Sequence, residues 1–302
     1  MGPMIDHPTF RRFNFLEPHT DGAFRIDCLG AKARSHYMPA AWFDFVAQPM
    51  QNEMLFEWID ILDAIATAGD RATVIDLGAG YGRWLVIAAL AAKQVGKAAH
   101  VVGLEAESVH YEWMLEHFAD NGVPPSDYTA IQAPVSDRAK DVIFVQGHPD
   151  EWYGQYILEK PNSGYGDWPN AKITKLRAMS ALSLIRRYPL IDALHMDIQG
   201  EELSVVPSIM RFATRNVRRM HVETHTREID EALPAFFRDY GWIPRFQLPC
   251  ETKGVTTPFG SIDFQGGVQS WENPKSRRLR FTPIFAPWAT AWESRRHPRF
   301  SN

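Results

Sequence analysis

Hydrophobic residues occur along this chain in two alternating patterns. Apolar, β-branched runs at 73–77 and 100–105 predict strands, and each is followed by a segment with apolar residues three and four positions apart, at 83–93 and 107–120. A third such run, 128–133, continues the series. Strands that alternate with helices predict an α/β fold with a mostly parallel sheet and helices on both faces.

The alternation resumes in the second half of the chain. The elements predicted there are a strand at 172–179, a helix at 181–187 that Ser180 caps, a strand at 193–196, a helix from about Glu201, a strand at 218–223, a helix at 228–240, and extended runs at 243–248 and 261–269. We expect the last two runs to complete the sheet as an antiparallel pair.

An N-terminal arm, residues 1–69, precedes the first core strand. An alternating run at 24–29 predicts a short strand, and residues 53–66 carry one apolar stripe at helical spacing. We expect this helix to pack on the sheet beside strand 73–77.

One long segment interrupts the alternation. A short strand is predicted at 142–145, and residues 146–171 then combine Gly, Pro and Asn with several Trp and Tyr side chains. Loops of this length inside a compact domain are usually functional or disordered, and aromatic side chains that can bury area argue against disorder. We predict an active-site loop within a catalytic domain of residues 70–270, with packing for stability alone as the alternative. Residues 271–302 form a basic, aromatic C-terminal tail.

Composition excludes several classes of protein. The 302 residues are 45% hydrophobic and 23% charged, with a net charge of −4, which argues against nucleic-acid binding over the whole surface. Two cysteines, Cys28 and Cys250, are too few for a disulfide framework and favour a reducing compartment. No secretory signal is apparent, and no apolar stretch approaches the roughly 20 residues of a membrane helix. We therefore expect a cytoplasmic protein with no membrane partner.

A glycine-rich turn follows the first core strand. It reads Asp-Leu-Gly-Ala-Gly-Tyr-Gly from Asp76 to Gly82 and leads into the predicted helix. Glycine lets the backbone approach a ligand closely, so strand, turn and helix can cradle a nucleotide. The dinucleotide fingerprint needs a glycine at position 83, where Arg83 stands, and an NAD-dependent oxidoreductase therefore ranks last among the alternatives. The next strand ends in Glu105, whose carboxylate can accept hydrogen bonds from both hydroxyls of a ribose.

The acid and the glycines at 78, 80 and 82 resemble motif I of class I S-adenosylmethionine-dependent methyltransferases. The resemblance implies a Rossmann-like class I methyltransferase fold with a mostly parallel seven-stranded sheet, and S-adenosylmethionine as the cofactor. The cofactor contacts expected from this fold are Asp76, Gly78, Gly80, Tyr81, Glu105, Ala106, Ser136 and Asp137. Asp137 would accept a hydrogen bond from the adenine amino group.

Two further acids stand at the ends of later predicted strands. Asp197 begins an Asp-x-Gln-Gly-Glu-Glu block, and Glu223 lies in a Val-Glu-Thr-His strand end at 222–225. Ligands in open α/β sheets bind at the carboxyl ends of strands, so both acids should share a crevice with Glu105.

Both blocks resemble those of FkbM-type methyltransferases, and the resemblance covers about residues 70–270. Members of that family are mostly O-methyltransferases of sugars and other natural products, and some need Mg²⁺. Gln199 departs from the family pattern, which more often has an acid there, and this removes one negative charge from a metal site.

Methyl transfer from a sulfonium requires an aligned nucleophile that loses its proton. An alcohol hydroxyl is weakly acidic, so it needs a general base, a metal ion or both. The candidate catalytic residues are Asp197, His225 and His195, with either imidazole as the base, and the candidate Mg²⁺ ligands are Asp197 and Glu223. The structural alternatives are a helix cap for Asp197, a buried salt bridge for Glu223 and core packing for His195.

The sequence therefore predicts an S-adenosylmethionine-dependent O-methyltransferase that acts on a small-molecule hydroxyl. Methylation of RNA or protein through the basic tail is an alternative, although the chain lacks the Asn/Asp-Pro-Pro-Tyr/Phe block used for base amino groups. A non-catalytic assembly module built on the cofactor fold is another. A homo-oligomer is also an alternative, with the tail and the arm forming contacts between subunits.

Overall fold

A seven-stranded sheet forms the centre of the molecule, in the order β13-β16-β12-β11-β4-β5-β6. The computed structural model describes residues 3–149, 155–158 and 171–276. The strands of the sheet are β4 (Arg71–Leu77), β5 (Ala98–Glu105), β6 (Tyr128–Gln132), β11 (Ala193–Met196), β12 (Arg219–Thr224), β13 (Ile243–Leu248) and β16 (Gly267–Glu272). β16 runs antiparallel to both of its neighbours, β12 and β13, and the other neighbouring strands of this sheet are parallel. The predicted α/β fold, with a mostly parallel seven-stranded sheet and helices on both faces, is confirmed.

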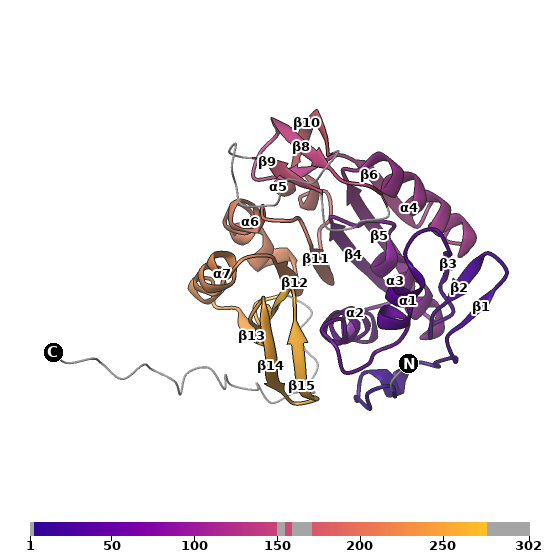
Figure 1. The fold of residues 1–302 in the computed structure, drawn as a ribbon. Helices are drawn as coiled ribbons and strands as arrows, with labels where there is room; N and C mark the ends of the chain where they lie inside the picture. The colour runs from indigo at the N-terminus through magenta and orange to yellow at the C-terminus, as the bar shows by residue number, and fades with distance from the viewer. Residues whose placement is uncertain (1–2, 150–154, 159–170, 277–302) are drawn as a thin grey trace.

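Helices cover both faces of this sheet (Figure 1). One face packs against α2 (Leu55–Thr67), α3 (Arg83–Gln94) and α4 (Ser108–Asp120), and the other against α5 (Ala181–Ile185), α6 (Glu202–Asn216) and α7 (Arg227–Asp239). The alternation of side chains along each strand produces this division. In β4, Ala72 and Val74 belong to the core under α2 and α3, whereas Ile75 and Leu77 belong to the core under α6 and α7.

Smaller elements surround the main sheet. They are the 3₁₀ helix η1 (Phe10–Arg12), helix α1 (Ala40–Val46), a sheet of β1 (His19–Asp21), β2 (Phe24–Ile26) and β3 (Lys32–Arg34), a sheet of β7 (Val135–Ser136), β8 (Lys140–Gln146), β9 (Tyr156–Leu158) and β10 (Lys172–Ser180), and the pair β14 (Thr252–Thr257) and β15 (Gly260–Phe264). None of the helices in the described ranges has the length and apolar character needed to cross a membrane.

Two sequence predictions need correction. The predicted strands at 142–145 and 172–179 are β8 and β10, which pair antiparallel with each other outside the main sheet. An antiparallel pair needs no crossover helix, and no helix is described between them. The run at 261–269 is two strands: its first half, in β15, pairs with β14, and only its second half, in β16, joins β13 as the predicted antiparallel pair.

Helix α2 lies deeper in the molecule than its apolar stripe predicts. It packs against β11 and β12, at the middle of the sheet. Because β11 is the strand next to β4, the expected position beside the first core strand is confirmed. Residues of the N-terminal arm, such as Phe10 and Leu29, share one hydrophobic core with α2 and α3. The arm is therefore part of the packed core on this face of the sheet.

Candidate cofactor and acceptor site

A cavity of about 180 Å³ lies at the carboxyl ends of β4, β5, β11 and β12. Its lining includes Gly78 and Gly80 of the glycine turn, Glu105, Asp197 and Glu223. The acids predicted to share one crevice therefore do so. Strand order reverses between β4 and β11, and open α/β sheets bind ligands at such a reversal.

The glycine turn is fixed between the ends of two neighbouring strands. The amides of Gly78 and Ala79 both donate to the carbonyl of Leu104, at 2.9 and 3.0 Å. Gly78 has φ +83°, and a Cβ at this position would lie 1.8 Å from the carbonyl oxygen of Asp197. The turn therefore passes so close to the end of β11 that only glycine fits.

Glu105 holds the turn from the other side. Its Oε2 accepts a hydrogen bond of 2.8 Å from the amide of Gly80, and its Oε1 accepts one of 2.7 Å from the amide of Glu107. Burial raises the pKa of this carboxyl group. Each carboxylate oxygen has a second lone pair, so Glu105 can still accept from two ribose hydroxyls. Ala106 also lines the cavity, beside Glu105.

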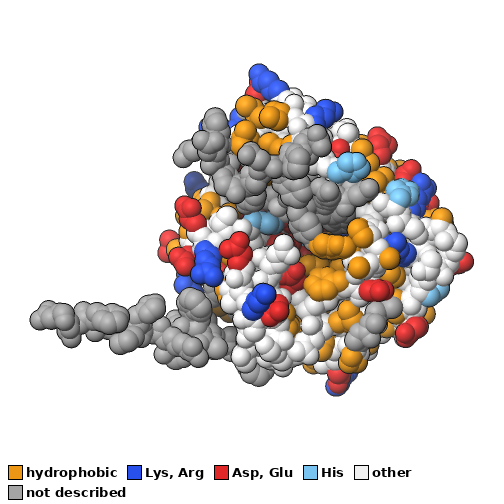
Figure 2. Space-filling model, viewed as in Figure 1, with side chains coloured by type: hydrophobic (Ala, Val, Ile, Leu, Met, Phe, Trp, Pro, Cys, Tyr) orange, Lys and Arg blue, Asp and Glu red, His pale blue; other side chains and the backbone are white. Residues whose placement is uncertain are grey.

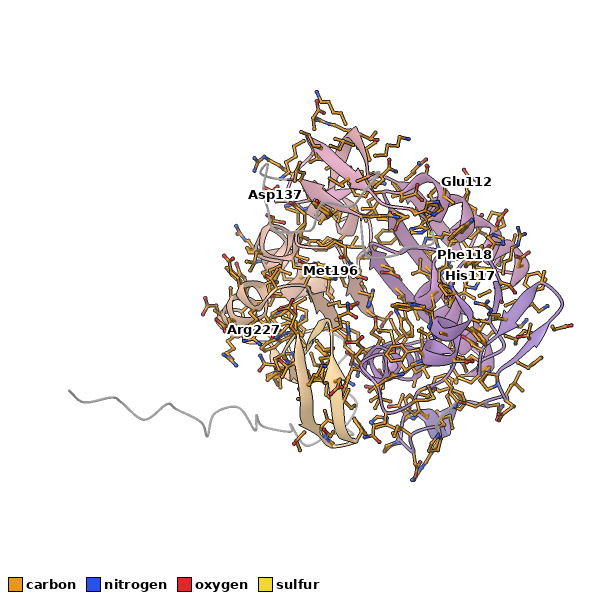
Figure 3. The ribbon with its side chains drawn as sticks, in the orientation of Figure 1. Glu112, His117, Phe118, Asp137, Met196 and Arg227 are labelled. Atoms are coloured by element: carbon orange, nitrogen blue, oxygen red, sulfur yellow. The ribbon has the colours of Figure 1, made fainter. Side chains whose placement is uncertain are left out.

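The predicted adenine contacts lie elsewhere. Neither Ser136 nor Asp137 lines the cavity, whereas the preceding Val135 does. The Ser136 hydroxyl donates to Glu201 at 2.7 Å, and Asp137 forms a 2.7 Å ion pair with Arg138. Figure 3 places Asp137 near the sheet of β8 and β10, apart from Met196 at the end of β11. Their contact with adenine stays a prediction that this arrangement does not support.

Asp197 and Glu223 line the acidic end of the cavity, and His225 lies behind them in contact with Asp197. Each offers a ligand atom within 4.8 Å of the others. The Asp197 carboxylate accepts from Gln199 at 2.7 Å and pairs with His225 at 3.2 Å. Burial opposes its charge, but the hydrogen bond from His225 lowers the pKa of Asp197 overall.

Glu223 differs from Asp197 because no described residue donates a hydrogen bond to its carboxylate. Burial, and then the negative charge of Asp197, raise the pKa of Glu223 well above its ordinary value. A carboxylate pair of this kind can hold a hard cation such as Mg²⁺, or take up a proton.

Both candidate histidine bases already have partners at both ring nitrogens. His195 contacts Asp76 at 2.8 Å and Glu57 at 3.1 Å. His225 contacts Asp197 and Glu202, each at 3.2 Å. Burial disfavours charge on both imidazoles, but the paired carboxylates raise the pKa of each well above its ordinary value. Because both ring nitrogens of each histidine are already engaged by carboxylates, the arrangement does not support either histidine as the base.

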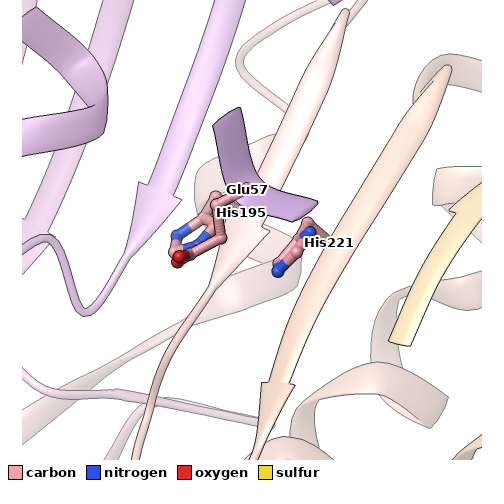
Figure 4. Close-up of side chains that lie close together, drawn as sticks. All are labelled: Glu57, His195 and His221. Atoms are coloured by element: carbon pink, nitrogen blue, oxygen red, sulfur yellow. The ribbon is translucent and has the colours of Figure 1, made fainter. Parts of the chain in front are cut away.

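A buried charged layer between α2 and the sheet was not predicted. Figure 4 shows Glu57 beside His195, with His221 on the next strand. His221 pairs with Asp60 at 2.8 Å. Glu57, His195 and His221 also bring ligand atoms within 4.8 Å of one another, but both nitrogens of His195 are engaged in ion pairs. The sequence does carry a signal for this charged layer: Glu57, Asp60 and Asp63 stand at every third position of an otherwise apolar helix.

The N-terminal arm contributes Met38, Trp42, Val46 and Met54 to the apolar wall of the cavity. Residues 155–157 also line it, and they belong to the predicted active-site loop at 146–171. The rest of that prediction falls largely on 150–154 and 159–170, which lie outside the described residues, as do residues 277–302 of the basic tail.

Tyr81 lies within the glycine turn, and its side chain is buried. Its ring packs against Tyr37 and His117, with ring centroids 5.2 and 5.0 Å away. The carbonyl of Tyr81 contacts Nδ1 of His117 at 3.1 Å. Figure 3 shows His117 on α4, next to Phe118. His117 is only 1% exposed, and burial lowers its pKa to about 3.

This low pKa predicts a loss of stability in acid. Below the ordinary histidine value of about 6.5, the unfolded chain binds a proton that folded His117 does not, so stability falls by up to about 1.4 kcal/mol per pH unit. Asp27, whose pKa burial raises to about 6, contributes the opposite slope. We expect His117→Gln to lose less stability than the wild type between pH 6.5 and pH 4, measured by urea unfolding. Equal losses would contradict a neutral His117 under the turn.

No family model matches the chain. A protein of Jannaschia sp. (strain CCS1) named "Putative methyltransferase" is 27% identical over 202 residues, which cover 64% of this chain and 70% of that protein. The FkbM methyltransferase structure from Methylobacillus flagellatus KT is 12% identical, covers 76% of this chain and 57% of its own, and has a TM-score of 0.46.

A SAM-dependent methyltransferase structure from Agrobacterium tumefaciens is 12% identical, covers 86% of this chain and 71% of its own, and has a TM-score of 0.47. The precorrin-6y C5,15-methyltransferase structure from Geobacter metallireducens GS-15 is 10% identical, covers 70% of this chain and 85% of its own, and has a TM-score of 0.40. With TM-scores this low, these likenesses carry no argument about activity.

Proposed function

We propose that the chain is an S-adenosylmethionine-dependent methyltransferase that methylates a hydroxyl of a sugar or other small molecule, in the manner of FkbM-type enzymes. One observation carries this proposal: a single cavity joins the glycine turn and Glu105 at one end to Asp197 and Glu223 at the other. The name of the Jannaschia relative agrees with a methyltransferase.

The two ends of the cavity have different tasks. Glu105 binds the ribose, and Ala106 lies beside it for the adenine. The close passage of Gly78 over the end of β11 supports a position of the methionine part of the cofactor next to Asp197. The acceptor hydroxyl then lies between the sulfonium and the two acids, in line with the bond to the methyl group.

Glu223 takes the proton of the acceptor hydroxyl. It lines the cavity, and no described residue hydrogen-bonds to its carboxylate, whereas Asp197 is already held by Gln199 and His225. Where Mg²⁺ is bound, Asp197 and Glu223 are the residues that would hold it. The ion would make the hydroxyl more acidic.

The face of the molecule shown in Figure 2 favours a small acceptor over RNA. On the face shown in Figure 2, Lys and Arg side chains are interspersed with Asp and Glu, without a continuous basic patch among the described residues. RNA binding through several phosphates needs a basic footprint. An apolar and aromatic lining such as Trp42, Trp84 and Phe144 suits a small molecule.

The direct test of the cofactor role is Glu105→Ala. The substitution removes the acceptor of the ribose hydroxyls, so we expect the binding of S-adenosylhomocysteine to weaken by roughly 1–3 kcal/mol in titration calorimetry. Glu228→Ala, which removes an exposed glutamate from the first turn of α7, serves as the control. Unchanged affinity in a folded Glu105→Ala variant would exclude Glu105 as the ribose ligand.

A further inference from the structure

Two buried charged groups on the cavity wall each have one atom without a hydrogen-bond partner among the described residues. They are Oε2 of Glu57 and Nη1 of Arg83. Buried polar atoms in folded proteins are almost always paired. Unpaired atoms on a cavity wall therefore indicate which groups the occupant supplies: a donor for Glu57 and an acceptor for Arg83.

Arg83 begins α3, directly after the glycine turn. Its Nη2 donates to the carbonyl of Val46, and its guanidinium lies over the rings of Trp84 and Trp58, with centroids 4.6 and 5.3 Å away. The side chain is 8% exposed, and no described carboxylate forms an ion pair with it. A guanidinium held in this way presents a rigid donor to a carboxylate.

Glu57 reaches the same wall from α2. Its Oε1 contacts His195 at 3.1 Å, whereas its Oε2 has no partner, and the residue is only 3% exposed. The ring of Trp84 lies near both groups: its centroid is 6.3 Å from that of His195, the partner of Glu57, and 4.6 Å from Cζ of Arg83. A carboxylate and a guanidinium thus line the same cavity.

On the basis of the proposed function, we propose that Glu57 and Arg83 bind the zwitterionic amino-acid end of S-adenosylmethionine. Glu57 accepts hydrogen bonds from the α-ammonium group, and Arg83 donates to the α-carboxylate. Each ligand charge then meets one protein atom that has no hydrogen-bond partner among the described residues, and the adenosine extends toward Glu105. Arg83 occupies the position where the dinucleotide fingerprint needs a glycine, and in this arrangement it binds the carboxylate of the cofactor.

The test compares two ligands that differ only in this end of the molecule. S-adenosylhomocysteine carries the amino acid, whereas 5′-methylthioadenosine keeps the adenosine and the thioether but lacks it. We expect Glu57→Gln and Arg83→Met to weaken S-adenosylhomocysteine binding by about 10- to 150-fold in calorimetry, as hydrogen bonds to charged groups do. Methylthioadenosine affinity should change by less than about 2-fold. Glu228→Gln and Arg238→Met, both on exposed positions of α7, are the matched controls.

Each outcome has a distinct meaning. Equal loss of both ligands in the variants, or no loss of either, would overturn the proposal. The wild-type chain supplies a second test that does not depend on the folding of variants, because it must bind methylthioadenosine at least about 10-fold more weakly than S-adenosylhomocysteine. If the wild type binds neither ligand, the proposed function itself fails.

Discussion

Replacing Gly78 with alanine is expected to destabilise the fold and abolish cofactor binding together. The new Cβ would lie 1.8 Å from the carbonyl oxygen of Asp197. Hydrogen bonds hold the backbone of both residues in place. Relief requires the ends of β4 and β11 to separate, which should cost more than about 4 kcal/mol of unfolding free energy. Urea unfolding monitored by circular dichroism measures this cost.

Gly96→Ala separates the clash from the effect of backbone conformation. Gly96 also has a positive φ, +69°, but a Cβ there meets nothing within 4 Å. Only the cost of the left-handed conformation remains, about 1–2 kcal/mol. Similar losses for the two variants would mean that Gly78 does not pass closely over the end of β11.

Replacing Glu223 with glutamine is expected to lower kcat roughly 10²- to 10⁴-fold. The amide keeps the shape of the side chain but can neither take up the acceptor proton nor hold a cation as a carboxylate does. Binding of S-adenosylhomocysteine should change little, because the ribose and amino-acid contacts lie elsewhere in the cavity. Single-turnover methyl transfer to an accepted alcohol, together with calorimetry, gives both quantities.

Glu228→Gln makes the same chemical change on the exposed face of α7 and should leave kcat unaltered. Measuring both variants with EDTA and with added Mg²⁺ shows whether the carboxylate acts through a cation. A Glu223→Gln enzyme with wild-type kcat would remove Glu223 from the reaction.

The main sheet could be predicted because its signals are local. Runs such as Thr73-Val74-Ile75 followed by a glycine turn specify strand, turn and helix within about 20 residues. The positions of β8 and β10 could not be predicted in this way. Their apolar patterns fit a strand in any sheet, and the choice of partner depends on contacts between distant segments.

The candidate site was predictable where each residue ends a strand. Glu105, Asp197 and Glu223 follow apolar runs, and parallel topology brings strand ends together at one edge. The partners of the histidines could not be predicted from the sequence, for a different reason. Glu57 lies on a helix more than a hundred residues away from His195, and only the packing of α2 on β11 brings them within 3.1 Å.

Titration calorimetry of the purified full chain with S-adenosylhomocysteine tests the central claim most directly. If the cavity between β4 and β11 holds an adenosyl donor, the titration will saturate at one ligand per chain. A chain that is folded by circular dichroism, yet takes up neither S-adenosylhomocysteine nor S-adenosylmethionine, would contradict the account.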